Sequence, residues 1–185
     1  MHPKEYKKVK NGTGHLTNLA LKNSELFVGI DFSNHKAVNE IISTYESFVL
    51  YPSKDALNIS IMNPYQDKDI VVKKKKMAIF IIDSTWACST KMLRESKNLQ
   101  ALNHISFLNT KISEFKIKEQ PADYCLSTIE STLCVLELLN KWEIENLYQD
   151  DLDRFLNPFY KMIEYQLKCI QNPLSDSIRF KPKKI

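Results

Sequence analysis

The amino-acid sequence predicts an α/β fold, a mainly parallel sheet with helices on both of its faces. Short apolar runs alternate with segments whose apolar residues recur at helical spacing, which is the pattern of a parallel sheet with crossover helices. The run from Met77 to Ile82 is apolar throughout, as expected of a strand covered on both faces. The length of 185 residues, 43% of them hydrophobic and 26% charged, fits one folded domain over residues 1–185.

The same patterns place the individual elements. The runs that predict strands are Leu26–Ile30, Phe48–Tyr51, Met77–Ile82 and His104–Leu108. Helical segments are expected after the first strand and at residues 53–61 (a short turn), 86–97, 127–142 and 152–170, with a polar loop at 63–76.

Two of these helices carry a clear apolar face. In the first helix Ser33 is the expected cap, and the stripe consists of Val38, Ile41, Ile42 and Tyr45. The last helix has a docking face formed by Leu152, Phe155, Phe159, Met162, Ile163, Leu167 and Ile170.

The composition excludes several kinds of site. Only three glycines occur, Gly12, Gly14 and Gly29, which excludes the glycine-rich phosphate loops of Rossmann, P-loop and common methyltransferase sites. The four histidines lack metal-ligand spacing, so no metal is expected. No apolar run approaches the roughly 20 residues that span a bilayer, so no membrane partner is expected.

Cysteine usage and charge indicate a compartment and a partner. The four cysteines are far apart, sit within apolar patterns and form no CxxC pair, which favours buried free thiols in a reducing cytosol and hence a cytoplasmic protein. The formal net charge is +4, and basic residues gather in three runs, Lys4–Lys10, Lys73–Lys76 and Arg179–Lys184. One such run is commonly a solvated loop or tail, but three together favour a polyanion as partner.

Polar residues follow the predicted strands where they end. Asp83 comes directly after the Met77–Ile82 strand, and Ser53 follows the strand that ends at Tyr51. Ligands of parallel sheets bind beyond these carboxyl ends. Asp83 is therefore either the N-cap of the next helix or a carboxylate base or ligand anchor. Trp86 is either a core residue or a platform that stacks on a base.

A second polar cluster begins the helix at residue 127. Ser127 and Glu130 have the spacing of a capping box, in which the hydroxyl accepts the third amide and the carboxylate accepts the cap amide. The start of a helix also attracts anionic groups. Capping and ligand binding are therefore compatible at this position.

Short blocks along the chain together resemble the DTW-domain family. The name motif is present in DSTW, Asp83 to Trp86. The other blocks, in family order, are HPKE (2–5), NGTGHL (11–16), LYPSKDA (50–56), IKEQP (117–121) and LSTIES (126–131). The match covers nearly the whole chain, and six blocks in order are a strong resemblance.

The resemblance implies a reaction, a fold and a set of residues. The family is similar to tRNA-uridine aminocarboxypropyltransferases, which move the 3-amino-3-carboxypropyl group of the co-substrate S-adenosylmethionine to N3 of a uridine in tRNA. It implies a SPOUT-like fold with a knotted cofactor site near the C-terminus, a rare topology. The implied catalytic residues are Asp83, Thr85 and Trp86. The implied cofactor-binding residues are Ser53, Lys118, Ser127, Thr128 and Glu130.

The sequence departs from the family pattern in two ways. Lys118 stands where arginine is common, so a point charge replaces a bidentate grip. Family members also commonly carry a cysteine-rich segment and a first strand ahead of the HP motif, where this chain begins. We expect an in-frame upstream extension with a β-rich segment.

Two other functions stay open at this point. A SPOUT-type RNA methyltransferase would use the same cofactor and polymer but transfer a different carbon. A non-catalytic RNA-binding module would carry a decayed site, against which the intact DSTW and STIE blocks argue. Fold resemblance alone does not separate these functions.

Overall fold

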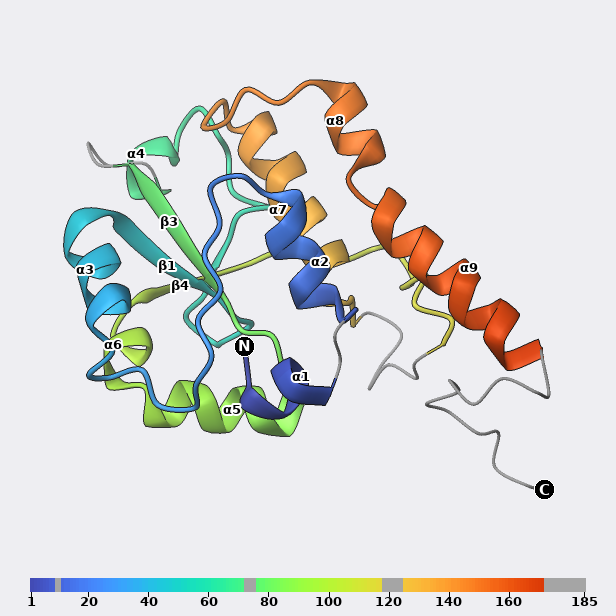
Figure 1. The fold of residues 1–185 in the computed structure, drawn as a ribbon. Coiled ribbons are helices and arrows are strands. Elements are labelled where there is room, and N and C mark those ends of the chain that lie inside the picture. The colour runs from blue at the N-terminus through green and yellow to red at the C-terminus, as the bar shows by residue number, and fades with distance from the viewer. Residues whose placement is uncertain (9–10, 72–75, 118–124, 172–185) are drawn as a thin grey trace.

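The computed structural model describes residues 1–8, 11–71, 76–117 and 125–171, and it confirms the α/β class (Figure 1). Within these residues the sheet has four parallel strands in the order β2-β4-β1-β3. The strands are β1 (Glu46–Leu50), β2 (Leu57–Asn58), β3 (Met77–Ile81) and β4 (Asn103–Ser106). Because all four run the same way, their carboxyl ends meet at one edge of the sheet.

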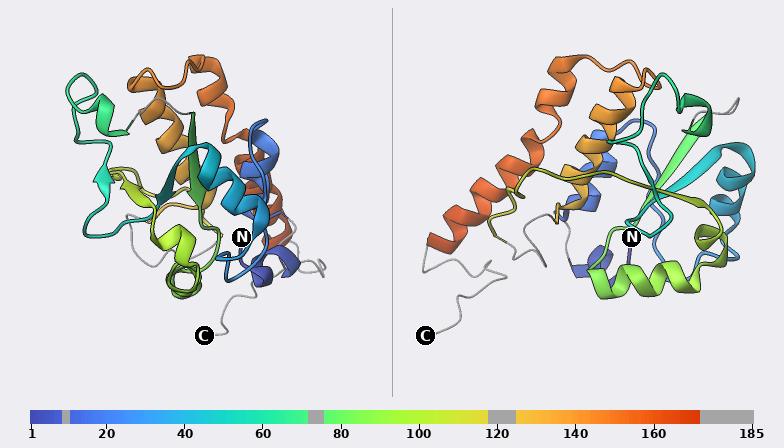
Figure 2. Two further views of the ribbon diagram at one scale, coloured as in Figure 1. Left: turned by 90° about the vertical axis from the view of Figure 1, so that its left-hand side faces the viewer. Right: turned by 180° about the vertical axis from the view of Figure 1, so that it is seen from behind.

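Helices cover both faces of this sheet, as predicted (Figure 2). The helices are α1 (Pro3–Lys8), α2 (Thr13–Ala20), α3 (Lys36–Thr44), α4 (Lys68–Val71), α5 (Trp86–Glu95), α6 (Lys97–Gln100), α7 (Thr128–Lys141), α8 (Gln149–Arg154) and α9 (Asn157–Gln171). On one face α3, α5 and α6 pack on Val49 and Phe80. On the other face Val71 of α4 and Trp142, at the end of α7, pack with Phe48.

A further layer lies outside α7. Helices α2 and α9 contact α7 and each other around a small core of Ile129, Phe159 and Ile163. The predicted helix over 152–170 is divided here, because α8 ends at Arg154 and α9 begins at Asn157, with Pro158 in its first turn, where proline is tolerated. The apolar docking face predicted for this helix is formed as expected, apart from Ile170, which is exposed.

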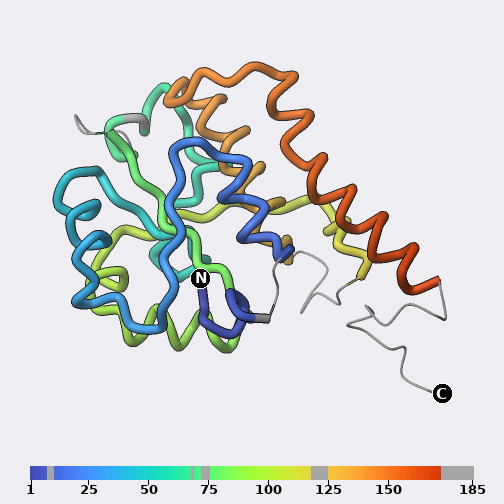
Figure 3. The backbone as a smooth tube through the Cα atoms, viewed as in Figure 1, coloured from blue at the N-terminus to red at the C-terminus, as the bar shows by residue number. Residues whose placement is uncertain are grey.

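The predicted strand at Leu26–Ile30 is wrong. This segment is not part of the sheet, and its backbone is hydrogen-bonded to the first residue instead. The Met1 amino group donates to the Phe27 carbonyl at 2.8 Å, and the Gly29 amide donates to the Met1 carbonyl at 3.2 Å. The apolar side chains of Phe27 and Ile30 still pack into the core. Figure 3 traces the segment between α2 and α3.

The expected cap of the following helix is also wrong. His35, not Ser33, is the N-cap of α3, and its ring accepts the Val38 amide. The Ser33 hydroxyl instead lies between other groups: its oxygen is 2.6 Å from Asp31 Oδ1 and 3.1 Å from the Glu95 carbonyl, and it accepts the Lys97 amide at 2.9 Å. It therefore supports the junction of α5 and α6. Helix α5 ends at Glu95, slightly before the end predicted at residue 97, and Ser96 separates it from α6.

Two further differences concern the strands. Residues 53–61 contain the short strand β2 in place of the predicted helical turn, because Leu57 and Asn58 pair with Ile105 and Ser106 of β4. The polar loop predicted over 63–76 includes the short helix α4. Strand β3 contributes to both cores as expected, but it lies at the end of the strand order, so each of its residues is partly exposed.

Candidate active site at the carboxyl ends of the strands

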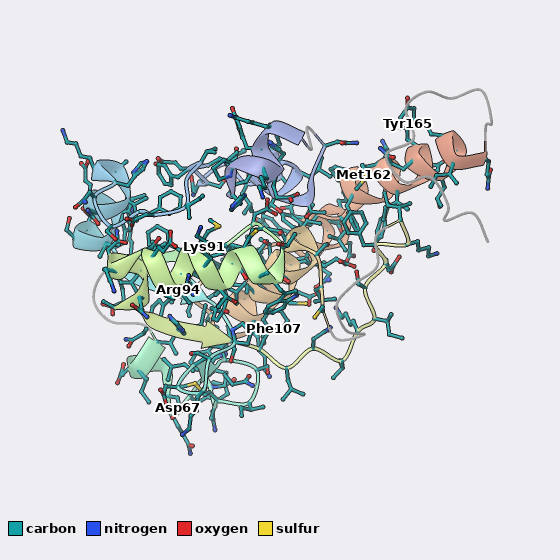
Figure 4. All side chains as sticks on the ribbon, turned by 90° about the horizontal axis from the view of Figure 1, so that it is seen from below. Asp67, Lys91, Arg94, Phe107, Met162 and Tyr165 are labelled. Carbon is teal, nitrogen blue, oxygen red and sulfur yellow. The ribbon has the colours of Figure 1, made fainter. Side chains whose placement is uncertain are left out.

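The parallel strands bring two predicted site segments to one edge. Ser53 follows β1 and Asp83 follows β3, and these strands are hydrogen-bonded neighbours. Helix α5 begins just after Asp83. Figure 4 views the molecule from below, with Lys91 and Arg94 labelled on α5. The edge is the place where parallel sheets bind ligands.

Asp83 is half-buried and bonded to two segments that are distant in the sequence. Its Oδ1 accepts a hydrogen bond from the Thr128 hydroxyl, with 2.6 Å between the two oxygens. Its backbone carbonyl accepts the His2 amide at 3.0 Å. Hydrogen bonds to a charged acceptor are the stronger kind. The carboxylate therefore fixes the end of β3 against the first residue of α7.

Gly14 of α2 lies directly against the same carboxylate. A Cβ atom at this glycine would be 2.4 Å from Cγ, 2.6 Å from Oδ2 and 2.7 Å from Oδ1 of Asp83. Atoms cannot approach so closely, so any side chain here would displace Asp83. In the sequence Gly14 stands out only as one of three glycines and as part of the NGTGHL block. No local pattern relates it to Asp83.

Thr85 and Trp86 lie at the surface where α5 begins. Thr85 is the N-cap of α5, so the interpretation of Asp83 as that cap is wrong. Trp86 is 44% exposed, which makes its interpretation as a core residue wrong as well. The Trp86 carbonyl accepts the hydroxyls of Ser89 and Thr90 at 2.8 and 3.1 Å. These bonds hold the first turn of α5 while the indole stays accessible.

The capping box at the start of α7 is confirmed. Glu130 is buried, and its Oε2 accepts the Ser127 amide at 2.9 Å and the Ser127 hydroxyl at 2.5 Å. The same carboxylate also accepts the Ser113 hydroxyl at 2.9 Å and the Glu114 amide at 2.7 Å. Glu130 therefore joins the start of α7 to the segment that leads to residue 118. A direct bond from Glu130 to a cofactor stays a prediction.

Ser53 has a partner that the sequence analysis missed. Its Oγ lies 2.9 Å from Nδ1 of His104 on β4. The other ring nitrogen, Nε2, is buried and has no hydrogen-bond partner among the described residues. Burial lowers the pKa of His104 below its usual value of 6.5. In the sequence His104 only begins a predicted strand, and no local pattern joins it to Ser53.

Lys118 lies outside the described residues, as do the whole of the run Arg179–Lys184 and parts of the other two basic runs. Among the residues that are described, no group of three or more His, Cys, Asp or Glu is placed to hold a metal ion. No helix in the described ranges is long and apolar enough to cross a membrane. None of the four cysteines forms a disulfide, but the expectation that they are buried holds only for Cys125, since Cys88, Cys134 and Cys169 are partly exposed.

A pocket of about 180 Å³ lies away from Asp83, between the 113–117 segment and α9. The residues that line it are Glu114, Lys116, Tyr160, Ile163, Glu164 and Leu167. Glu114 is also held by Glu130 through its amide. The pocket therefore borders the segment that Glu130 anchors, and neither Asp83 nor Ser53 is among the residues that line it.

The family of the chain is shown by a sequence profile described as DTW domain, which matches residues 1–167. The chain belongs to the DTW domain family. Its DTW motif is the one at Asp83, Thr85 and Trp86, which the structure places at the strand ends.

Three curated relatives of this DTW chain carry the name "tRNA-uridine aminocarboxypropyltransferase 2". The Drosophila melanogaster protein is 26% identical over 135 residues, covering 72% of this chain and 48% of the relative. The Mus musculus protein is 24% identical over 146 residues, covering 76% of this chain and 44% of the relative. The Macaca fascicularis protein is 25% identical over 125 residues, covering 66% of this chain and 37% of the relative. The chain thus spans less than half the length of each relative. No solved structure matches it significantly.

Proposed function

We propose that this chain transfers the 3-amino-3-carboxypropyl group of S-adenosylmethionine to N3 of a uridine in tRNA, releasing 5′-methylthioadenosine. The observation that carries the proposal is the Asp83 carboxylate, held at the strand-end edge by Thr128 in a member of the DTW domain family. The name of the relatives supports the coarser part of this proposal, transfer of an aminocarboxypropyl group to a uridine of tRNA. A SPOUT-like fold with a knotted cofactor site belongs to this proposal.

The reaction determines what the site must provide. A bond forms between uridine N3 and the chain carbon attached to sulfur, and the bond from that carbon to sulfur breaks. The bonding electrons stay on sulfur, which becomes a neutral thioether, and N3 loses its proton. S-adenosylmethionine supplies the electrophilic carbon. The protein must align N3 within about 3–3.5 Å of that carbon and accept the proton.

Asp83 is the group suited to accept this proton or to orient the uracil edge. Its Oδ1 is occupied by the Thr128 hydroxyl, whereas Oδ2 has no hydrogen-bond partner within the described part of the chain. The carboxylate is therefore fixed in position by Thr128 and by the close approach of Gly14, and it keeps one oxygen without a hydrogen bond. A base positioned in this way contributes about a hundred- to ten-thousand-fold to the rate.

The remaining residues fit S-adenosylmethionine by their chemistry. The Ser127 amide is bonded to Glu130, but the next amide of the α7 start, that of Thr128, suits the carboxylate of the transferred chain, and Lys118 would add a positive charge. Ser53 offers a hydroxyl at the same edge. Glu130 supports the arrangement by holding both α7 and the segment before Lys118.

The RNA side of the site would use exposed groups. The indole of Trp86 can stack on a base, and the Thr85 hydroxyl lies next to it. Lys91 and Arg94 are exposed on α5, and a side-chain nitrogen of each lies within 4 Å of the Glu95 carboxylate (Figure 4). Together with the three basic runs, these two side chains would contact tRNA phosphates. A tRNA substrate fits the cytoplasmic location expected from the free thiols.

The test follows the atoms of the cofactor. Purified protein is incubated with tRNA and with S-adenosylmethionine labelled either in the methyl group or in the methionine carboxyl, and the nucleosides are analysed by mass spectrometry. Carboxyl label should enter a uridine, and methyl label should remain in 5′-methylthioadenosine. Methyl label in the tRNA would overturn the proposal and favour a methyltransferase.

A matched pair of variants tests the role of Asp83. Asp83→Asn keeps the shape of the side chain and should lower the rate by about a hundredfold or more, while binding of S-adenosylmethionine is retained. Asp151→Asn changes an exposed carboxylate on α8 and should leave the rate unchanged. A rate near wild type in folded Asp83→Asn would remove the catalytic assignment.

A further inference from the structure

His104 is held by two elements of the strand-end edge. Its Nδ1 is 2.9 Å from Ser53 Oγ, and its ring meets the Tyr51 ring edge-on, with centroids 5.9 Å apart and planes at 69°. The Tyr51 hydroxyl in turn lies 3.1 Å from the hydroxyl of Thr90 on α5. The imidazole is therefore fixed relative to both β1 and α5.

The second ring nitrogen determines the direction of the bond to Ser53. Burial lowers the pKa of His104, so at neutral pH the ring is neutral and carries one N–H. Nε2 is buried without a partner among the described residues. A buried N–H without an acceptor is rarer in proteins than a buried lone pair without a donor. Assigning the lone pair to Nε2 places the proton on Nδ1, so that Nδ1–H donates to Ser53 Oγ.

This direction leaves the hydroxyl hydrogen of Ser53 without an acceptor in the described part of the protein. Ser53 is partly exposed at the edge where the ligand is expected. We propose that His104 is a positioning residue that turns the Ser53 hydroxyl hydrogen toward bound S-adenosylmethionine, so that Ser53 donates to an acceptor atom of that ligand. The inference rests on the proposed function, of which the contact between Ser53 and the cofactor is a part.

Two substitutions separate this role from simple packing. In His104→Asn the amide nitrogen can occupy the place of Nδ1 and donate to Ser53. In His104→Gln the amide extends toward the place of Nε2 and does not reach Ser53. Both variants remove the ring and its contact with Tyr51, so a packing role would make them equivalent.

The experiment measures the affinity of the whole chain for S-adenosylmethionine by calorimetry, with thermal melting of each variant. His104→Asn should bind within about threefold of wild type, and His104→Gln and Ser53→Ala should each bind roughly 3- to 10-fold more weakly. Because His104 acts through Ser53, the double variant His104→Gln/Ser53→Ala should bind no more weakly than Ser53→Ala alone.

The outcomes are distinguishable. A wild-type protein that does not bind S-adenosylmethionine contradicts the proposed function itself. If the wild-type protein binds S-adenosylmethionine, two results would overturn the positioning role. One is equal affinity of the His104→Asn and His104→Gln variants, and the other is additive effects in the double variant. Nitrogen-15 spectra of histidine-labelled wild-type protein report the tautomer without any substitution. A proton on Nε2 of His104 would also overturn the inference.

Discussion

Replacing Gly14 with alanine should separate the stability of the protein from its activity. The new Cβ would lie 2.4 Å from Asp83 Cγ, whereas carbon atoms in ordinary contact are about 3.5 Å apart, so the carboxylate must move by about 1 Å. A misplacement of about 1 Å can cost a hundredfold in rate. We therefore expect Gly14→Ala to lower the transfer rate by about a hundredfold or more.

The expected loss of stability is much smaller. Moving Asp83 weakens its bond with Thr128, which as a hydrogen bond to a charged group is worth about 1.5–3 kcal/mol. Alanine in place of glycine within a helix returns about 0.5–1 kcal/mol. The free energy of unfolding, measured in urea, should thus fall by about 0.5–2.5 kcal/mol, which leaves the chain folded.

Gly12→Ala is the matched control. Gly12 is the N-cap of α2, with φ −66° and ψ 156°, a conformation that alanine adopts without strain. Alanine is a poorer cap than glycine, so this variant should also lose some stability. Its rate should stay near that of wild type. A normal rate in Gly14→Ala, or an equal loss in both variants, would refute the reasoning.

Three other variants or conditions test the site. Glu130→Gln places an NH₂ group among the four groups that donate to this carboxylate. The free energy of unfolding should therefore fall by at least about 1.5–3 kcal/mol. An unchanged melting temperature would contradict the role of Glu130 as an anchor. Trp86→Ala should hardly change stability because the indole is 44% exposed, but should raise KM for tRNA about 5- to 100-fold if it stacks on a base. Burial lowers the pKa of His104 in the folded chain. Between about pH 6.5 and this lowered pKa, the unfolded chain therefore binds a proton that the folded chain does not bind. The free energy of unfolding should fall as the pH drops through this range. His104→Asn should lose this part of the pH dependence in chemical denaturation.

Features that depend on neighbours in the sequence could be predicted. The capping box needs only Ser127 and Glu130, three residues apart, and the structure confirms it. The apolar run that forms β3 and the position of Asp83 after it are equally local. Parallel pairing then places Asp83 and Ser53 at one edge, because strands that alternate with helices end on the same side.

Features that depend on distant partners could not be predicted. The run Leu26–Ile30 has the composition of a strand, but a strand also requires a neighbouring strand, and this segment bonds to Met1. The contact of Gly14 with Asp83 joins segments that no periodicity relates. For the same reason the bond between His104 and Ser53 had no signal in the sequence.

The bonds of Asp83 also bear on the order in which the chain becomes active during synthesis. Its carboxylate is fixed by Thr128, from the latter part of the chain, and its carbonyl by His2, from the beginning. A nascent chain still on the ribosome can form β1, β3 and α5 before residue 128 has emerged, but its carboxylate lacks the hydroxyl that fixes it. We expect such an intermediate to be compact yet inactive, with activity arising only after α7 has docked.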